Sequence, residues 1–126
     1  MSVKFFRCPS CGNVIYLMEG DINNIRCCGK EMDELVPASV EASTEKHIPE
    51  ITEVDGRLDI QVGSSIHPMI EKHYIEWIAA ENIDGNMHIK YLTPGVEPKV
   101  SFCNHHRKIR HIYAYCNIHG LWVKNL

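Results

Sequence analysis

The 126-residue sequence contains no apolar run that approaches the roughly 20 residues needed to cross a bilayer. It has no excess of basic residues either, because 13 Lys and Arg stand against 16 Asp and Glu and give a formal net charge of -3. General nucleic-acid-binding proteins are usually basic, so this balance argues against that class. We also find no internal repeat, no low-complexity segment and no long amphipathic helix. These absences favour a globular protein built from short strands.

A secretion signal is missing as well. Residues 1–7 contain no long apolar region and no signal-type cleavage site, so we expect a cytoplasmic protein. A chain of this length can bury roughly two-thirds of its unfolded surface. The hydrophobic share is 44%, which is ordinary for a globular protein. The sequence therefore predicts a protein with a hydrophobic core of its own.

Metal-binding residue types, in contrast, are abundant. The chain has six cysteines and eight histidines. In a reducing compartment, clustered cysteines indicate metal ligation rather than disulfides, and neutral imidazole is the commonest nitrogen ligand for metals. The cysteines form two close pairs and two isolated residues: Cys8, Cys11, Cys27, Cys28, Cys103 and Cys116.

Residues 1–36 have the pattern of a small metal-binding domain. Two short strands, at 3–7 and 14–18, flank a knuckle in which Gly12 permits a tight turn. So few residues cannot form a stable core alone, and a metal ion is the usual remedy. The cysteines Cys8, Cys11, Cys27 and Cys28 could bind Zn or Fe tetrahedrally. Because Cys27 and Cys28 are adjacent, we expect a distorted site whose backbone path differs from that of a zinc ribbon.

A domain boundary is predicted at Pro37-Ala38-Ser39, which is a small and polar break. Residues 37–126 then contain about seven short strands separated by regular turn signals such as Asp55-Gly56. That pattern predicts an all-β fold, with a seven-stranded immunoglobulin-like β-sandwich after the small domain. The expected strands are 51–54, 58–62, 73–80, 87–92, 99–103, 109–115 and 121–123.

A second set of possible ligands lies in this larger domain. Cys116 and His119 fall on a turn between two predicted strands, so one loop could offer a thiolate and an imidazole. His47, His67 and His73 lie near turns or strand ends, and a sandwich collects its loops at two ends. Together these residues offer one thiolate and four imidazoles, more than a structural zinc site needs. Such a set suits iron in a square-pyramidal arrangement with one open position.

Several segments, in this order, resemble a known family. They are Cys8-Pro9-Ser10-Cys11-Gly12-Asn13 with Cys27-Cys28-Gly29, Glu45-Lys46-His47-Ile48-Pro49, His67-Pro68-Met69 with His73-Tyr74-Ile75, and Cys116-Asn117-Ile118-His119-Gly120-Leu121-Trp122. The chain resembles the desulfoferrodoxins, the two-iron class of superoxide reductase. The resemblance covers nearly the whole chain, with a desulforedoxin-like iron-binding domain at 1–36 and a superoxide reductase domain at 37–126.

The resemblance implies two irons per chain, an Fe(Cys)4 centre and an Fe(His)4Cys centre. The first would be held by Cys8, Cys11, Cys27 and Cys28, and the second by His47, His67, His73 and His119 with Cys116 as axial ligand. Glu45 and Lys46 would lie beside the open position and take part in catalysis. The implied activity is one-electron reduction of superoxide to hydrogen peroxide, with electrons from a donor such as rubredoxin. The family also implies a homodimer.

Other residues receive structural interpretations. Cys103 is expected to be a buried free thiol, Trp77 to lie in the sandwich core, and Trp122 to pack beside the second ligand loop. His88, His105, His106 and His111 have no ligand-type spacing and are expected on the surface. The basic segment 104–108 could alter a surface that meets an electron donor.

Three alternatives stay open on the residues alone. A blue-copper carrier also places Cys and His on a β-sandwich loop, but it usually has a Met soon afterwards, and no Met follows His119. A zinc-binding module for protein or nucleic-acid contacts would be colourless. A pure electron-transfer protein would differ in that its second iron would bind no external anion.

Overall fold

The structure is a computed structural model that describes residues 3–40 and 46–126. The chain divides after Val36 into two compact units, at the position where the sequence analysis placed the domain boundary. Within the described residues, no helix is long and apolar enough to cross a membrane. Strands dominate both units, so the predicted all-β class is confirmed.

The first unit consists of short hairpins. One sheet has the strand order β2-β1-β5, and a separate two-stranded ribbon pairs β3 with β4. The 3-10 turn η1 is capped by Asp21, whose side chain accepts a hydrogen bond of 2.9 Å from the Asn23 amide. The elements are β1 (Lys4–Arg7), β2 (Val14–Leu17), η1 (Ile22–Asn24), β3 (Arg26–Cys27), β4 (Lys30–Glu31) and β5 (Asp33–Leu35).

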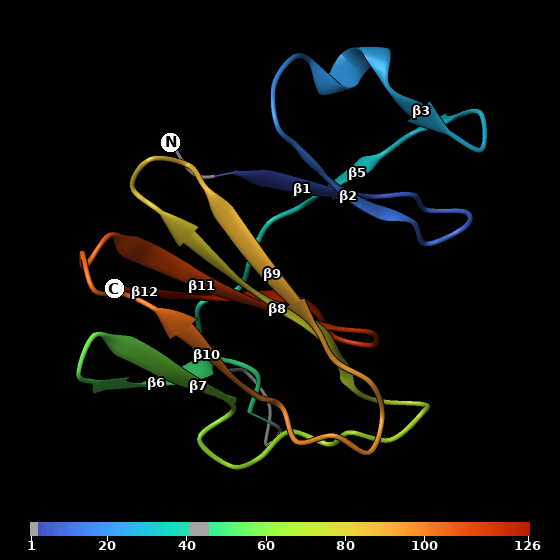
Figure 1. The fold of residues 1–126 in the computed structure, drawn as a ribbon. Helices are drawn as coiled ribbons and strands as arrows, with labels where there is room; N and C mark the ends of the chain where they lie inside the picture. Colours follow the sequence, from blue (N-terminus) through green and yellow to red (C-terminus); the bar gives the residue numbers. More distant parts are fainter. Residues whose placement is uncertain (1–2, 41–45) are drawn as a thin grey trace. The chain divides into compact units, whose positions relative to one another are not determined.

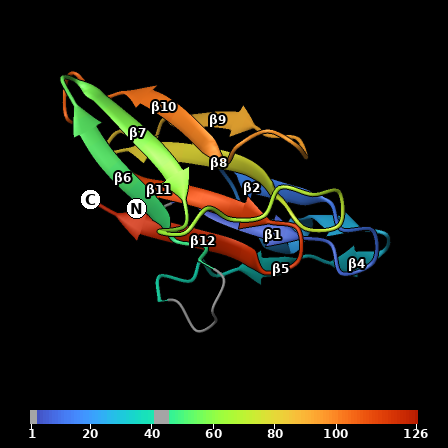
Figure 2. The ribbon, with the colours of Figure 1, turned by 90° about the horizontal axis from the view of Figure 1, so that it is seen from below.

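The second unit is the predicted seven-stranded sandwich. A three-stranded sheet has the order β10-β7-β6 and a four-stranded sheet the order β12-β11-β8-β9, all antiparallel. Figure 1 shows the green β6–β7 hairpin below the red β11 and β12, and Figure 2 shows β6, β7 and β10 side by side. The strands are β6 (Pro49–Val54), β7 (Arg57–Val62), β8 (Ile75–Asn82), β9 (Met87–Tyr91), β10 (Lys99–Cys103), β11 (Ile109–Cys116) and β12 (Gly120–Asn125).

The core of the sandwich follows from alternation along its strands. In β7, Leu58, Ile60 and Val62 are buried, whereas the residues between them are more exposed. A strand points successive side chains to opposite faces, so one face of β7 meets the other sheet and one meets solvent. Facing it are buried residues of β8 and β11, among them Ile78 and Ile112. Cys116, a potential metal ligand, belongs to this core, so its position is fixed by the packing of the sandwich.

Turn chemistry fixes the hairpins. Asp55 and Gly56, between β6 and β7, have φ values of 41° and 78°. Two successive residues with positive φ suit the tight turn that the Asp-Gly pair predicts. That hairpin is therefore confirmed at its predicted position.

Two burial predictions were wrong. Cys103 is exposed because its neighbour Phe102 takes the inward position on β10, and alternation turns the thiol outward. Trp77 is only half-buried. Ile78 faces the core, so Trp77 lies on the opposite face of β8, where it stacks on Tyr115 with ring centroids 5.5 Å apart.

The two ends of the sandwich carry different loops. Strand β11 begins at Ile109, directly after the basic segment 104–108, and ends at Cys116. Seven steps of about 3.4 Å place these points roughly 24 Å apart. The basic segment therefore lies away from the second ligand group and is not part of the surface around it.

Candidate metal centres

The four cysteines of the first unit converge. The sulfur atoms of Cys8, Cys11, Cys27 and Cys28 all lie within 4.8 Å of one another. The Cys8 carbonyl accepts a hydrogen bond of 3.1 Å from Gly12, whose φ of 79° closes the first turn. Cys28 itself has a φ of 53°, which is uncommon for a residue with a side chain. This backbone conformation lets the two adjacent cysteines point toward one position, as expected from the sequence for a distorted site.

Crowding has opposite effects on the acidity of these thiols. A hydrogen bond from the Cys11 amide lowers the pKa of Cys8 to about 6. The pKa of Cys27 rises to about 12, chiefly because side-chain hydrogen bonds to Cys8 and Cys11 favour its protonated form. Burial and negative charge together disfavour several thiolates at one point unless a cation joins them. The chemistry of this cluster therefore fits a thiophilic metal ion.

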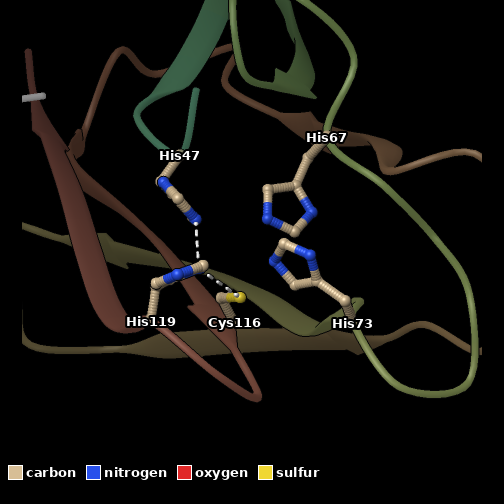
Figure 3. Close-up of side chains that lie close together, drawn as sticks. All are labelled: His47, His67, His73, Cys116 and His119. Carbon is tan, nitrogen blue, oxygen red and sulfur yellow. Dashed lines mark hydrogen bonds between the residues drawn. The ribbon is translucent and has the colours of Figure 1, made fainter. Parts of the chain in front are cut away.

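The second group joins three segments of the sandwich: the one before β6, the one between β7 and β8, and the turn between β11 and β12. The ligand-type atoms of His47, His67, His73, Cys116 and His119 also lie within 4.8 Å of one another. Figure 3 shows the four imidazoles and the thiol pointing toward a common centre. His47 Nε2 lies 3.1 Å from His119 Nδ1, which in turn lies 3.7 Å from the Cys116 sulfur. Two nitrogens on opposite sides of one metal ion are roughly 4.2 Å apart, twice a bond of about 2.1 Å. The spread therefore fits one ion.

His67 shows how an imidazole of this group is prepared for a metal. Its Nδ1 lies 2.8 Å from the Pro68 carbonyl oxygen, so Nδ1 carries the proton and donates. The lone pair then belongs to Nε2, the nitrogen available to an ion. Metal-binding histidines typically anchor their second nitrogen in this way, which fixes the tautomer and the ring orientation.

Comparison with known proteins shows the family of the chain. The desulfoferrodoxin family model matches residues 39–125. The chain belongs to the desulfoferrodoxin family. A desulfoferrodoxin from Desulfarculus baarsii is 37% identical over 95% of this chain and 94% of its own length. The superoxide reductase of Treponema pallidum, at 25% identity, superposes with a TM-score of 0.81 over 98% of both chains. A superoxide reductase (1Fe-SOR) from Giardia intestinalis, 34% identical, has a TM-score of 0.57 and covers 66% of this chain and 98% of its own.

In this desulfoferrodoxin-family chain, Trp122 packs against the second group as expected. It is buried, and its ring stacks on His47 with centroids 4.5 Å apart and an interplanar angle of 11°. A parallel bridge to Ala38 holds this part of β12. The indole therefore fixes the plane of one imidazole and keeps water from its face.

Gly63 is a residue that the sequence analysis missed. Its φ is 86°, and a Cβ built there would lie 2.2 Å from the Ser65 oxygen and 2.5 Å from the Lys46 oxygen. Only glycine allows the Lys46 backbone to pass so close to the turn that leads to His67. A glycine directly after a predicted strand was the available signal.

The remaining site predictions have different outcomes. Lys46 precedes His47 and is half-buried, whereas Glu45 lies outside the described residues. His88, His105 and His106 are exposed, as expected. The fourth of these histidines, His111, is half-buried, and its Nδ1 lies 2.6 Å from the Asn125 side-chain oxygen. None of these four belongs to either ligand group among the described residues.

Proposed function

We propose that this protein is a superoxide reductase that uses an iron ion held by His47, His67, His73, His119 and Cys116. The observation that carries the proposal is the convergence of four imidazoles and one thiol at one end of the sandwich. The names of the similar proteins, desulfoferrodoxin and superoxide reductase, support the same activity. The reaction adds one electron and two protons to superoxide and gives one hydrogen peroxide.

When bound in this group, ferrous iron supplies the electron and an open coordination position for a small anion. The protein residues set the conditions. The Cys116 thiolate, buried at the end of β11, donates electron density from one side. The four neutral imidazoles add no charge, so the group keeps a net positive site that attracts an anion.

Lys46 and Glu45 are the proposed catalytic residues. Lys46 directly precedes His47, so its ammonium can raise the local concentration of superoxide at the open position. Glu45 is proposed as a carboxylate that would serve as a further ligand for the ion. Water near the exposed His119 is the proposed source of protons.

The cysteine group has a different proposed role. Four thiolates around iron leave no open position, so Cys8, Cys11, Cys27 and Cys28 would form an Fe(Cys)4 centre for electron transfer or stability. We further propose that a rubredoxin-like protein supplies electrons and that the chain forms a homodimer. Both groups need reduced thiols, which suits a reducing compartment such as the cytoplasm.

The first experiment is iron analysis with visible spectroscopy on wild type, Cys116→Ser and Cys103→Ser. Cys103 is an exposed thiol outside both groups, so its variant controls for cysteine loss. We expect two irons per chain, a thiolate-to-iron band on oxidation by superoxide, and peroxide without dioxygen. Cys116→Ser should abolish this reaction and keep the iron of the cysteine group.

Full activity of Cys116→Ser would refute the role of the thiolate. Zinc alone, without colour or superoxide consumption, in protein purified from its native host would favour the zinc-binding module. A second iron that is reduced and oxidised normally but binds no anion would favour a pure electron-transfer protein.

A further inference from the structure

Asn117 makes a set of contacts that neither ligand group explains. It lies between Cys116 and His119, and its side-chain oxygen accepts a hydrogen bond of 2.9 Å from the Tyr74 amide. Its side-chain nitrogen donates to the Lys72 carbonyl at 3.1 Å. Its own amide donates to the Tyr74 carbonyl at 3.2 Å. One residue thus binds the backbone on both sides of His73.

The segment that carries His73 also forms a turn of its own. The Ile70 and His73 amides and carbonyls exchange hydrogen bonds of 3.1 and 2.9 Å. These bonds define the local turn, but they do not tie it to the loop of Cys116. Met69, just before the turn, packs against the hydrophobic core cluster, and its carbonyl accepts a hydrogen bond of 2.7 Å from the Gly95 amide. The side-chain bonds of Asn117 are the ones that tie the turn to the loop of Cys116.

The neighbouring strand ladder does not fix this position either. Strand β11 pairs with β8 in regular register from His111 to Tyr115, and the register shifts between Tyr115 and Cys116. The bonds of Asn117 begin directly after this irregularity. They therefore restore a defined alignment where the regular ladder has ended.

We propose that Asn117 is a positioning residue that holds the His73 imidazole in place relative to Cys116 and His119. An asparagine is suited to this task because its amide donates and accepts at once. An aspartate would keep the acceptor for Tyr74 and lose the donor for Lys72. The inference rests on the proposed metal centre, because the alignment matters only if these residues share one ion.

The test uses the full chain, labelled with ¹⁵N and loaded with Zn²⁺. Correlation spectra of imidazole nitrogens report which histidines bind metal, and the cysteine group contains no histidine. The His73 signals are assigned with a His73→Gln variant.

The variants to be compared with wild type are Asn117→Ala, Asn117→Asp and Asn82→Ala. Asn82 is the matched control, because its side chain also makes two backbone hydrogen bonds, to Asp84 and Asn86, at the other end of β8.

We expect Asn117→Ala to remove the metal-bound signals of His73 and to keep those of His47 and His67. Competition with a chelator, followed by these signals, should show a Zn²⁺ affinity lower by roughly 10–100-fold. Asn117→Asp should fall between wild type and Asn117→Ala, and it carries the same test if the alanine variant does not fold. Asn82→Ala should lower the melting temperature and keep all histidine signals.

Wild-type signals and affinity in Asn117→Ala would overturn the inference while leaving the metal centre intact. Equal loss of the metal-bound signals of all four histidines would overturn it too. That result would mean that Asn117 stabilises the whole site rather than the position of His73. No metal-bound histidine in the wild type would remove the proposed centre itself.

Discussion

Two lysines differ in their distance from the second ligand group. Lys46 is the cation next to His47 in the chain, and Lys108 is a cation at the other end of β11, 3.0 Å from Asp84. Their replacement by alanine changes the net charge equally. The two positions therefore separate local attraction from the effect of total charge.

We expect Lys46→Ala to slow superoxide reduction by roughly tenfold, the lower end of the range for electrostatic steering. Its rate should also depend less on ionic strength, because salt screens the attraction that was lost. Stopped-flow or pulse-radiolysis rates at several salt concentrations measure both effects. Lys108→Ala should keep the wild-type rate and salt slope. An unchanged rate and slope in Lys46→Ala would exclude the residue from the mechanism.

On the outer face of β7, the charge of the Asp59 carboxylate contributes to the free energy of unfolding. A hydrogen bond of 2.8 Å from Arg57 is the main cause of its lowered pKa, and Ser101 adds a second bond of 2.6 Å. The folded state therefore holds the proton of Asp59 less tightly than the unfolded state. The resulting stabilisation is complete above the ordinary pKa of about 3.9 and is lost as the pH falls toward the lower, folded value.

Urea unfolding of wild type and Asp59→Asn from pH 7 to pH 3 tests this relation. The wild type should be more stable at neutral pH, and the difference should shrink below about pH 4. Because the pair is partly exposed, the difference should also decrease in high salt. A difference that stays constant across this pH range would show that the carboxylate charge does not contribute.

At the scale of loops and strands, Gly63 controls how the chain approaches the second group. Its φ of 86° nearly equals the 84° of Gly85, but only a Cβ at Gly63 would meet other backbone atoms. Gly85→Ala thus measures the cost of the left-handed backbone alone, about 1–2 kcal/mol. Comparing the two alanine substitutions therefore separates the cost of backbone strain from the cost of a steric clash.

Gly63→Ala should cost more than Gly85→Ala in urea unfolding, because the Lys46 backbone must move away from the new methyl group. It should also weaken metal binding at the histidine group, since His47 follows Lys46 directly. Gly85→Ala should leave metal binding unchanged. Equal effects of the two substitutions on stability and on metal binding would show that the close approach at Gly63 has no functional consequence.

The same scale shows what the sequence could predict. Strand 99–103 was predicted to the residue, and the Asp55-Gly56 hairpin followed from local turn chemistry. The strand predicted at 73–80 instead runs from Ile75 to Asn82, because the turn around His73 closes on Ile70. That closure is a tertiary feature that alternation and propensity do not encode.

The members of the two candidate ligand groups were predictable from the sequence, but the contacts that hold them in place were not. Cysteine and histidine spacing, with the family resemblance, named all nine residues that the structure brings together in two groups. The hold of Asn117 on Lys72 and Tyr74 joins segments more than 40 residues apart. The prediction that Cys103 is buried was wrong, because an apolar strand pattern does not reveal toward which face of the sheet its last residue points.

At the scale of the whole molecule, the two units depend on metal to different degrees. In the first unit, described strands are only two to four residues long, and the cysteine group joins two of its hairpins. The second unit has a continuous core that links both sheets. A metal ion therefore contributes a larger share of the stability of the first unit.

Removal of metal with a strong chelator should raise hydrogen exchange throughout residues 3–36 and leave β7, β8 and β11 protected. A Cys11→Ser variant should give the same pattern without a chelator. Protection of the first unit that survives metal removal would show that its fold does not require the ion.

The order of the ligands along the chain also separates the two groups in time. The cysteine group is complete once Cys28 has been synthesised. The histidine group, in contrast, begins with His47 and is complete only when His119 has been added, 72 residues later. At about 5–20 residues per second, that interval is roughly 4–14 s on the ribosome. A nascent chain can therefore complete its cysteine group early, whereas the proposed site of the histidine group cannot form until nearly all of the sandwich has emerged. The topology of the fold thus delays assembly of the histidine group until the protein around it exists.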